Sequence, residues 1–201
     1  EDPDIKRFKR EVAAYLGLPI TYASYADPSF DQFDIARKHS AFKIGHGSVL
    51  CTSRLKTEPF AAYLAEHYPV ERDAQGGAIV STRLTAYYGF DKTETARITR
   101  RSGIMAVMGY ATDYPLALWP WRLIESTREI GIEPPLTYST FKHANCVGCI
   151  KAGRQHWYVV FCTRRDVWEN ACDAEARLGH SILPDAYLEE LEPMFEKMLA
   201  L

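Results

Sequence analysis

The chain has 201 residues, with 24 Lys and Arg against 26 Asp and Glu, a formal net charge of −2 at pH 7, and 47% hydrophobic residues. This balance is ordinary for a globular protein. It excludes a dedicated, strongly basic nucleic-acid-binding domain but leaves room for a local basic patch that contacts nucleic acid. No apolar run reaches the roughly 18 residues that a membrane span needs, and nothing at the start resembles a signal peptide. We therefore expect a cytoplasmic protein whose five cysteines are ligands, nucleophiles or core residues rather than disulfides.

The first part of the chain predicts helices separated by short strand-like and glycine-bearing stretches. Ile5, Phe8, Val12 and Leu16 recur at helical spacing, and Gly17 is a natural stop. The expected elements are a helix over 5–17, a strand over 18–25, a helix over 31–42, a glycine loop over 43–48 and a helix in the second half of 53–68.

The rest of the chain alternates between apolar strand-like runs and amphipathic helices. Such alternation predicts an α/β domain around a mostly parallel sheet, in which ligands sit at the carboxyl ends of the strands. The loops after the two strand-like runs are therefore the expected binding region. The expected elements are strands over 83–90 and 104–110, helices over 91–103, 122–132, 156–179 (one or two) and 184–201, and a core-packing aromatic loop over 111–121.

The stretch "NCVGCIKAG" holds Cys146 and Cys149 in a Cys-x-x-Cys turn, which Gly148 can relax. Two such sulfurs come close enough to bind one metal ion or cluster. A structural turn with two buried thiols and a redox dithiol are the alternatives. A metal site needs more ligands, for which Cys51 and then His143 are the candidates. Two other cysteines, Cys162 and Cys172, are interpreted as core residues.

Basic residues also follow Cys51 in the sequence. In "CTSRLKTEP", Arg54 and Lys56 follow Cys51 closely, which suits an anionic substrate beside a thiolate or cluster. An ordinary exposed helix start is the equally weighted alternative.

The segment "GFDKTETARITRR" follows a predicted strand. Gly89 permits a sharp turn, and Asp91 or Thr93 can cap the next helix, whose N-terminus could bind an anion. Arg97 could face a phosphate, or it could simply pair with Glu94 one turn away.

The order of these motifs resembles the phosphoadenosine-phosphosulfate (PAPS) reductase family, within the adenine-nucleotide alpha-hydrolase or PP-loop group. The likeness covers nearly the whole chain. It rests on "CTSRLKTEP", "GFDKTETARITR" and the run "YPLALWPW…GIEPPLTYSTF…NCVGCIKAG". The "HxNCxGCxKxG" pattern is most similar to family members carried by phages and mobile elements.

The resemblance implies a Rossmann-like, five-stranded and mostly parallel sheet flanked by helices, with an adenine nucleotide such as ATP at the strand ends. It implies that Lys56 and Arg97 act on phosphate or sulfate groups and are the catalytic residues. It also implies that Cys51, Cys146 and Cys149 hold a four-iron four-sulfur cluster, with zinc as the alternative metal. The substrate-binding residues predicted on this basis are Arg54, Lys56, Gly89, Asp91, Glu94, Arg97, Arg100, His143 and Lys151.

The chain departs from the family in three places. Leu50 precedes Cys51 where cluster-bearing members have adjacent cysteines, so only three ligands carry over. The glycine-rich PP-loop has no match in these residues: either it lies upstream of Glu1, or the protein does not turn over nucleotide. The C-terminal Glu-Cys-Gly nucleophile is also missing.

We therefore expect sulfur-transfer or nucleotide-activation chemistry rather than thiol-dependent reduction. The alternative is a non-catalytic nucleotide- or zinc-binding module of a larger assembly. The expected domains are a PAPS reductase-like α/β domain over 1–160 and a helical extension over 161–201. Expected partners are an adenine nucleotide, a sulfur donor or protein partner, and a second copy in a homodimer.

Overall fold

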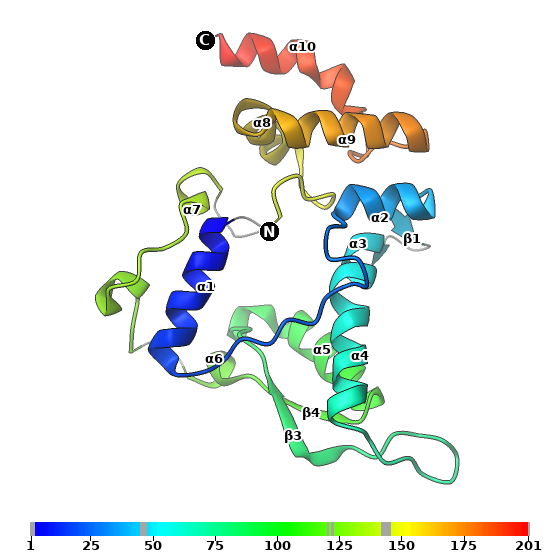
Figure 1. The fold of residues 1–201 in the computed structure, drawn as a ribbon, viewed down its shortest axis with the longest axis vertical. Helices are drawn as coiled ribbons and strands as arrows, with labels where there is room; N and C mark the ends of the chain where they lie inside the picture. Colours follow the sequence, from blue (N-terminus) through cyan, green and yellow to red (C-terminus); the bar gives the residue numbers. More distant parts are fainter. Residues whose placement is uncertain (1–2, 45–47, 120, 122, 142–145, 201) are drawn as a thin grey trace. The chain divides into compact units, whose positions relative to one another are not determined.

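The computed structural model describes residues 3–44, 48–119, 121, 123–141 and 146–200 (Figure 1). The described chain is mixed α/β with a helical C-terminal part. It divides into two compact units, one combining Glu1–Phe60 with Ile130–Leu201 and the other spanning Ala61–Glu129.

The N-terminal part of the first unit contains two of the predicted helices. Helix α1 spans Pro3–Leu16 and ends at Gly17, whose φ of +64° is left-handed, as the sequence predicted. Helix α2 spans Gln32–His39 and begins at Asp31, whose carboxylate accepts the first free backbone N–H groups. The strand expected over 18–25 is wrong: this segment is irregular, because it pairs with no neighbouring strand.

A continuous helical run follows a short antiparallel hairpin and crosses Pro59. Proline has no N–H to donate and clashes with the carbonyl four residues earlier. The run accommodates Pro59 by widening to a π-helix in the turn before it. The second unit begins inside this run, at Ala61. The elements are β1 (Lys43–Ile44), β2 (Ser48–Val49), α3 (Leu50–Thr52), the π-helical segment η1 (Ser53–Thr57) and α4 (Glu58–His67).

Helices near the C-terminus build the main core of the first unit. The two helices allowed over 156–179 are both present, and the C-terminal amphipathic helix is confirmed. The domain boundary predicted after residue 160 falls inside α8, which spans both sides of it. This helix packs against both α9 and α10. The elements are α7 (Thr137–Thr140), α8 (Arg154–Thr163), α9 (Arg165–Leu178) and α10 (Leu188–Leu199).

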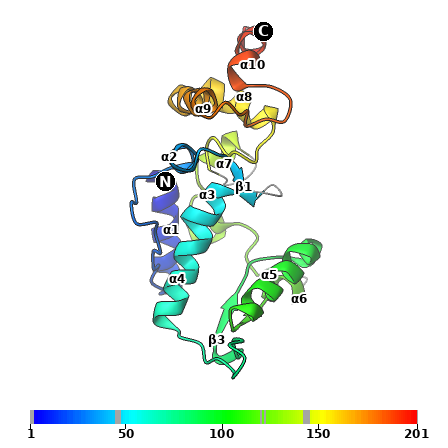
Figure 2. The ribbon, with the colours of Figure 1, turned by 90° about the vertical axis from the view of Figure 1, so that its right-hand side faces the viewer.

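Figure 2 shows α2 beside the helical C-terminal part, with α8, α9 and α10. Large aromatic side chains from these four helices pack together in the core. Trp168 lies edge-on to Phe161, with ring centroids 5.1 Å apart, and packs against Phe195 at 5.6 Å. Trp157 and Phe33 are also fully buried. Burial of this apolar surface is the principal stabilising contribution in the first unit.

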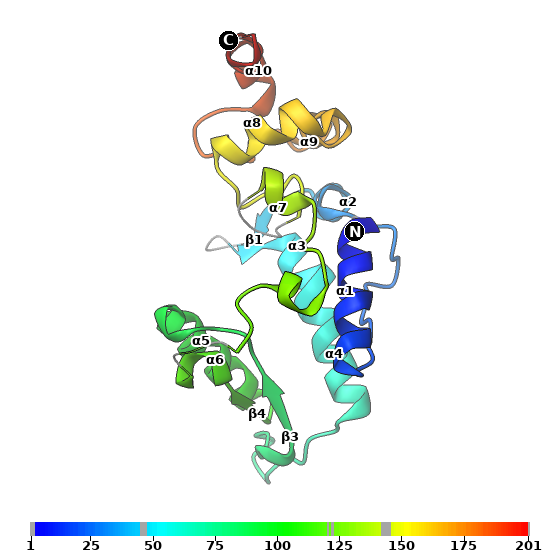
Figure 3. The same ribbon diagram turned by 90° about the vertical axis from the view of Figure 1, so that its left-hand side faces the viewer.

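The second unit is a small α/β layer (Figure 3). Strands β3 (Ser81–Tyr87) and β4 (Tyr110–Asp113) pair in parallel, and α5 (Thr95–Val107) connects them. The described strands of this unit form a two-stranded sheet, smaller than the five-stranded sheet that the resemblance implies. The remaining short elements are η2 (Lys92–Glu94), α6 (Pro115–Leu118) and η3 (Thr127–Ile130), which ends one residue beyond the unit.

Three predictions in this region are wrong. Residues 104–107 continue α5 instead of forming a strand, because Met and Ala favour helix and the stop is Gly109, with φ +87°, rather than Gly103. Within 122–132, the described residues form only η3. The loop expected to pack on the core leaves Trp119 and Trp121 exposed, at 63% and 72%.

The longest helices, α1 and α9, have 14 residues each. Within the described part of the chain, no helix combines the length and apolar character needed to cross a membrane.

Candidate thiol and anion site

Two segments far apart in the sequence meet in the first unit. The Lys56 ammonium contacts the Cys146 thiol, with 3.7 Å between Nζ and Sγ across 90 residues of sequence. Burial raises the pKa of the Cys51 thiol, Cys146 and Cys149 raise it further, and Lys56 and Lys151 lower it. The cysteines and lysines predicted from "CTSRLKTEP" and "NCVGCIKAG" therefore share one electrostatic neighbourhood.

The π-helical segment presents the basic side chains of this site. Cys51 lies in α3, half-buried against the hydrophobic core, whereas Lys56 is exposed. Arg54 forms an ion pair with Glu58, with 2.6 Å between Nη1 and Oε1. Lys56 is therefore the better placed of the two cations to meet an anion, since the charge of Arg54 is already partly balanced.

The Cys-x-x-Cys turn is fixed by packing and hydrogen bonds. Gly148 has φ +72°, and a Cβ there would lie 2.6 Å from a methyl carbon of Val167 and 3.3 Å from the ring of Phe33. The Gln32 amide donates to the carbonyl oxygens of Val147 at 3.0 Å and Gly148 at 3.3 Å. Only glycine suits this position, so the predicted role of Gly148 extends from the turn to the packing around it.

Two residues of this site, Gln32 and His156, were not identified from the sequence. His156, in the first turn of α8, accepts a hydrogen bond at Nε2 from the backbone N–H of Cys149 at 3.4 Å. Its position seven residues after Cys149 is the signal that could have identified it. The predicted ligand His143 lies outside the described residues.

The donor types fit a thiophilic metal or cluster, since three thiols share the site and soft metals favour thiolate. Among residues 3–44, 48–119, 121, 123–141 and 146–200, however, no three Cys, His, Asp or Glu side chains are placed to close around an ion. Coordination by Cys51, Cys146 and Cys149 therefore requires side-chain or turn movement.

The remaining predicted residues lie in the second unit, after the carboxyl end of β3. The Asp91 carboxylate accepts the Thr93 N–H at 2.8 Å, and Glu94 accepts the Asp91 N–H at 3.3 Å. This capping arrangement begins η2, the short 3₁₀ turn that leads directly into α5, so the predicted cap at Asp91 is confirmed. Arg97 pairs with Glu94 and lies over the Phe90 ring, 4.3 Å from its centroid. In this structure Arg97 therefore pairs with Glu94, the alternative to a phosphate contact, and Asp91 serves as a helix cap.

An aromatic cluster that was not predicted adjoins these residues. Tyr88, Phe90 and Tyr114 stack with centroids 5.7 to 6.1 Å apart at the carboxyl ends of β3 and β4. Arg101 lies over Tyr88 at 5.4 Å. Burial raises the pKa of Tyr88, an effect that Arg101 opposes. Two other predicted residues, Gly89 and Arg100, are exposed.

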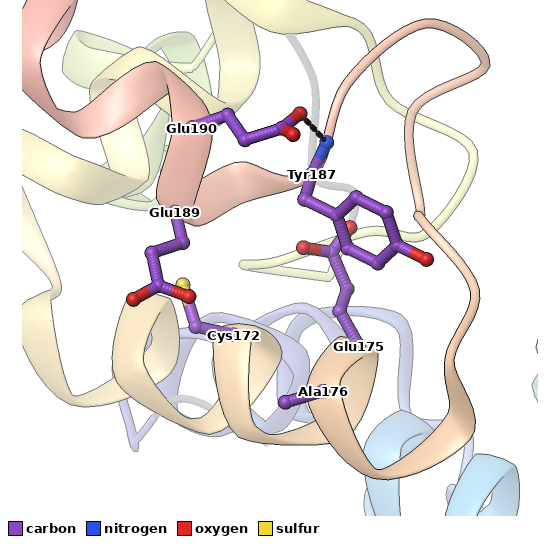
Figure 4. Close-up of a pocket in the computed structure, with 6 residues that line it drawn as sticks. All are labelled: Cys172, Glu175, Ala176, Tyr187, Glu189 and Glu190. Carbon is purple, nitrogen blue, oxygen red and sulfur yellow. Dashed lines mark hydrogen bonds between the residues drawn. The ribbon is translucent and has the colours of Figure 1, made fainter.

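A cavity of about 290 Å³ lies between α9 and the start of α10 (Figure 4). Glu175 is 1% exposed, and its carboxylate accepts the N–H groups of Ile182 at 2.6 Å and Leu188 at 2.7 Å. Burial raises the pKa of the neighbouring Cys172 thiol to about 12, which keeps it protonated at neutral pH. Glu175 thus anchors α10 to α9, and we interpret this acidic cavity as structural. Its lining comprises Cys172, Glu175, Ala176, Tyr187, Glu189 and Glu190.

No protein-family model, no curated protein and no solved structure matches the chain. The functional interpretation therefore depends on the thiols, lysines and arginines described above, together with the motif resemblance.

Proposed function

We propose that the chain belongs to a PP-loop-type enzyme, similar to the PAPS reductase family, that acts on an adenine nucleotide. Its chemistry is sulfur transfer or nucleotide activation, and its first unit carries the thiol site. The proposal assigns the protein to the cytoplasm, where thiols stay reduced.

The contact between Lys56 and Cys146 carries the proposal. A cation beside a thiol is the arrangement needed where an anionic group meets a sulfur centre. Lys56 would neutralise charge on a phosphate or sulfate group as it leaves or transfers, the electrostatic contribution that dominates such reactions. Lys151 adds a second positive charge to the same neighbourhood.

The proposal also gives the second unit an anion-binding role. Arg97 is proposed to meet a phosphate or sulfate group, with Arg100 nearby on α5. Because Arg97 is paired with Glu94, substrate binding has to replace that pairing. The Rossmann-like sheet implied by the resemblance remains part of the proposal, with β3 and β4 as two of its strands.

An iron–sulfur cluster or a zinc ion, when bound to Cys51, Cys146 and Cys149, would supply a soft Lewis-acidic centre for a sulfur donor. The chain's own residues would hold that donor: Lys56 and Lys151 would attract its negative charge, and the half-buried Cys51 would exclude water from one side.

The alternative is a nucleotide- or zinc-binding module without catalysis. The pairing of Arg54 with Glu58 and of Arg97 with Glu94 favours it, because both charges are partly balanced before any ligand binds.

Protein purified without oxygen tests the proposal through its iron, acid-labile sulfide and zinc contents and the effect of ATP on its melting temperature. We expect near-stoichiometric iron and sulfide that Cys146→Ser loses and Cys162→Ser keeps. We also expect stabilisation by ATP that Lys56→Ala weakens. Zinc with ATP stabilisation supports the binding module. A protein that contains no metal and is not stabilised by ATP would contradict both functions.

A further inference from the structure

The Cys149 end of the Cys-x-x-Cys turn is held by the side chain of His156, which belongs to none of the predicted motifs. We infer that His156 is a positioning residue of the thiol site: its imidazole fixes the backbone of Cys149, as Gln32 fixes the middle of the turn. The inference rests on the proposed function, because the position of Cys149 matters only where the three thiols act together.

The hydrogen bond defines the form of the imidazole. Nε2 accepts the Cys149 N–H at 3.4 Å, so Nε2 is unprotonated and the proton of the neutral ring sits on Nδ1. A side chain that holds this position must offer an acceptor at the same point. Glutamine can do so, because its terminal oxygen reaches about as far as Nε2, whereas phenylalanine cannot.

Packing holds the ring where the bond needs it. His156 lies against Phe141, with centroids 4.9 Å apart, and edge-on to Trp157 at 6.1 Å. Trp157, the next residue in α8, is fully buried in the helical core, so the backbone that carries the His156 ring is anchored to that core. Positioning groups are effective when they are built on such rigid elements.

The rest of the turn is already held by other bonds. The Ala152 N–H donates to the Cys149 carbonyl at 2.9 Å, and Gln32 bonds the carbonyls of Val147 and Gly148. His156 supplies the bond to the one N–H group between them, that of Cys149. Its loss frees the turn at the residue that carries a proposed ligand, and groups that orient metal ligands typically change affinity 10–100-fold.

The test compares His156→Phe, which keeps an aromatic ring but offers no acceptor, with His156→Gln, which keeps the acceptor. His180→Phe, at an exposed position after α9, is the matched control. Two quantities are measured on the full chain: hydrogen exchange of the Cys149 amide by NMR, and Co²⁺ binding followed by thiolate-to-cobalt absorption.

We expect His156→Phe to exchange the Cys149 amide about tenfold faster and to bind Co²⁺ about 10–100-fold more weakly. His156→Gln and His180→Phe should stay close to the wild type in both measurements. Wild-type values for His156→Phe in either measurement overturn the inference, as does a His156→Gln variant that behaves like His156→Phe.

The proposed function fails separately. A wild-type protein that shows no thiolate-to-cobalt absorption rejects its metal site, and the amide exchange of the variants then decides alone whether His156 holds the turn.

Discussion

The two compact units differ in how much apolar side chain each one buries. The first has a continuous core between α2, α8, α9 and α10, whereas the buried hydrophobic residues of the second are Leu64, Met105, Tyr110 and Tyr114. A parallel sheet is ordinarily covered on both faces, and a pair of strands is marginal by itself. We therefore expect the second unit to open more readily than the first.

The same difference separates the thiols from the arginines that are proposed to bind anions. The thiols are attached to the well-packed unit through Cys51 and the Gln32-held turn, so the fold holds the backbone that carries them. Arg97 and Arg101 lie over aromatic rings of the thinly packed unit. The thiols therefore need only local movement to coordinate an ion, whereas the arginines lie in a unit that can adjust to a ligand.

The largest expected effect comes from removing a core ring of the first unit. Trp168→Ala should lower the free energy of unfolding by about 3–5 kcal/mol, because it leaves a cavity among Phe161, Trp157 and Phe195. Urea unfolding followed by circular dichroism measures it. Trp119→Ala, at an exposed tryptophan of the second unit, should change stability by less than about 0.5 kcal/mol. Equal losses of stability in the two variants would contradict the difference in packing between the two units.

Gly148 tests the packing of the turn. Gly148→Ala combines a left-handed φ with a Cβ 2.6 Å from Val167, so it should cost about 2–4 kcal/mol in urea unfolding. Gly179→Ala is the matched control, since Gly179 has φ +66° with no atom within 4 Å of the added Cβ, and should cost about 1–2 kcal/mol. If Gly148→Ala loses no more stability than Gly179→Ala, the turn can shift to accommodate the added Cβ, and the account of its packing is wrong.

Glu175 gives the pH dependence of the first unit. Glu175→Gln should cost about 1–3 kcal/mol, because an amide nitrogen would face one of the two backbone N–H groups that the carboxylate accepts.

Burial holds the native pKa of Glu175 above its ordinary value of 4.5. The contribution of this shift to stability is therefore fully present below about pH 4.5 and is lost as pH rises through the native pKa. The wild-type advantage over Glu175→Gln should be larger at pH 4 than at pH 8, by urea unfolding at both values. An advantage that grows with pH contradicts the sign, and Glu196→Gln on the exposed part of α10 is the surface control.

The smallest effect on stability is expected at the thiol site itself. Glu58→Gln removes a partly exposed ion pair with Arg54, worth about 0–1 kcal/mol after solvent screening. It also frees the Arg54 charge, so ATP should stabilise the variant more than the wild type in thermal melts. Unchanged or weaker stabilisation of the variant by ATP would show that Arg54 is not part of the anion site.

Local sequence patterns predicted most of the helices and, in the parallel sheet, β3 but not β4. Helical periodicity and capping located α1, α2, α8, α9 and α10, because these depend on residues within a few positions of one another. The run "IMAVMGY" was misassigned because a short apolar run fits a strand and a buried helix end equally well. The helix continues past Gly103 and ends just before Gly109, inside the run itself.

The candidate site shows the same limit. Cys51, Lys56 and the Cys-x-x-Cys pair were identified from motif order, and Gly148 from turn chemistry. Gln32 was not, because its bond to the turn crosses 115 residues of sequence and depends on how α2 packs beside α9. The aromatic cluster around Phe90 was missed for the same reason, since Tyr114 joins it from a second strand.

The central claim is that Cys51 and the Cys-x-x-Cys turn form one thiol site. Cross-linking of the reduced protein with a short bifunctional thiol reagent, followed by peptide mass spectrometry, tests it most directly. The account predicts a cross-link between the peptide of Cys51 and that of Cys146 or Cys149, absent in Cys51→Ser and retained in Cys162→Ser. Cross-links confined to Cys146 and Cys149 would contradict it.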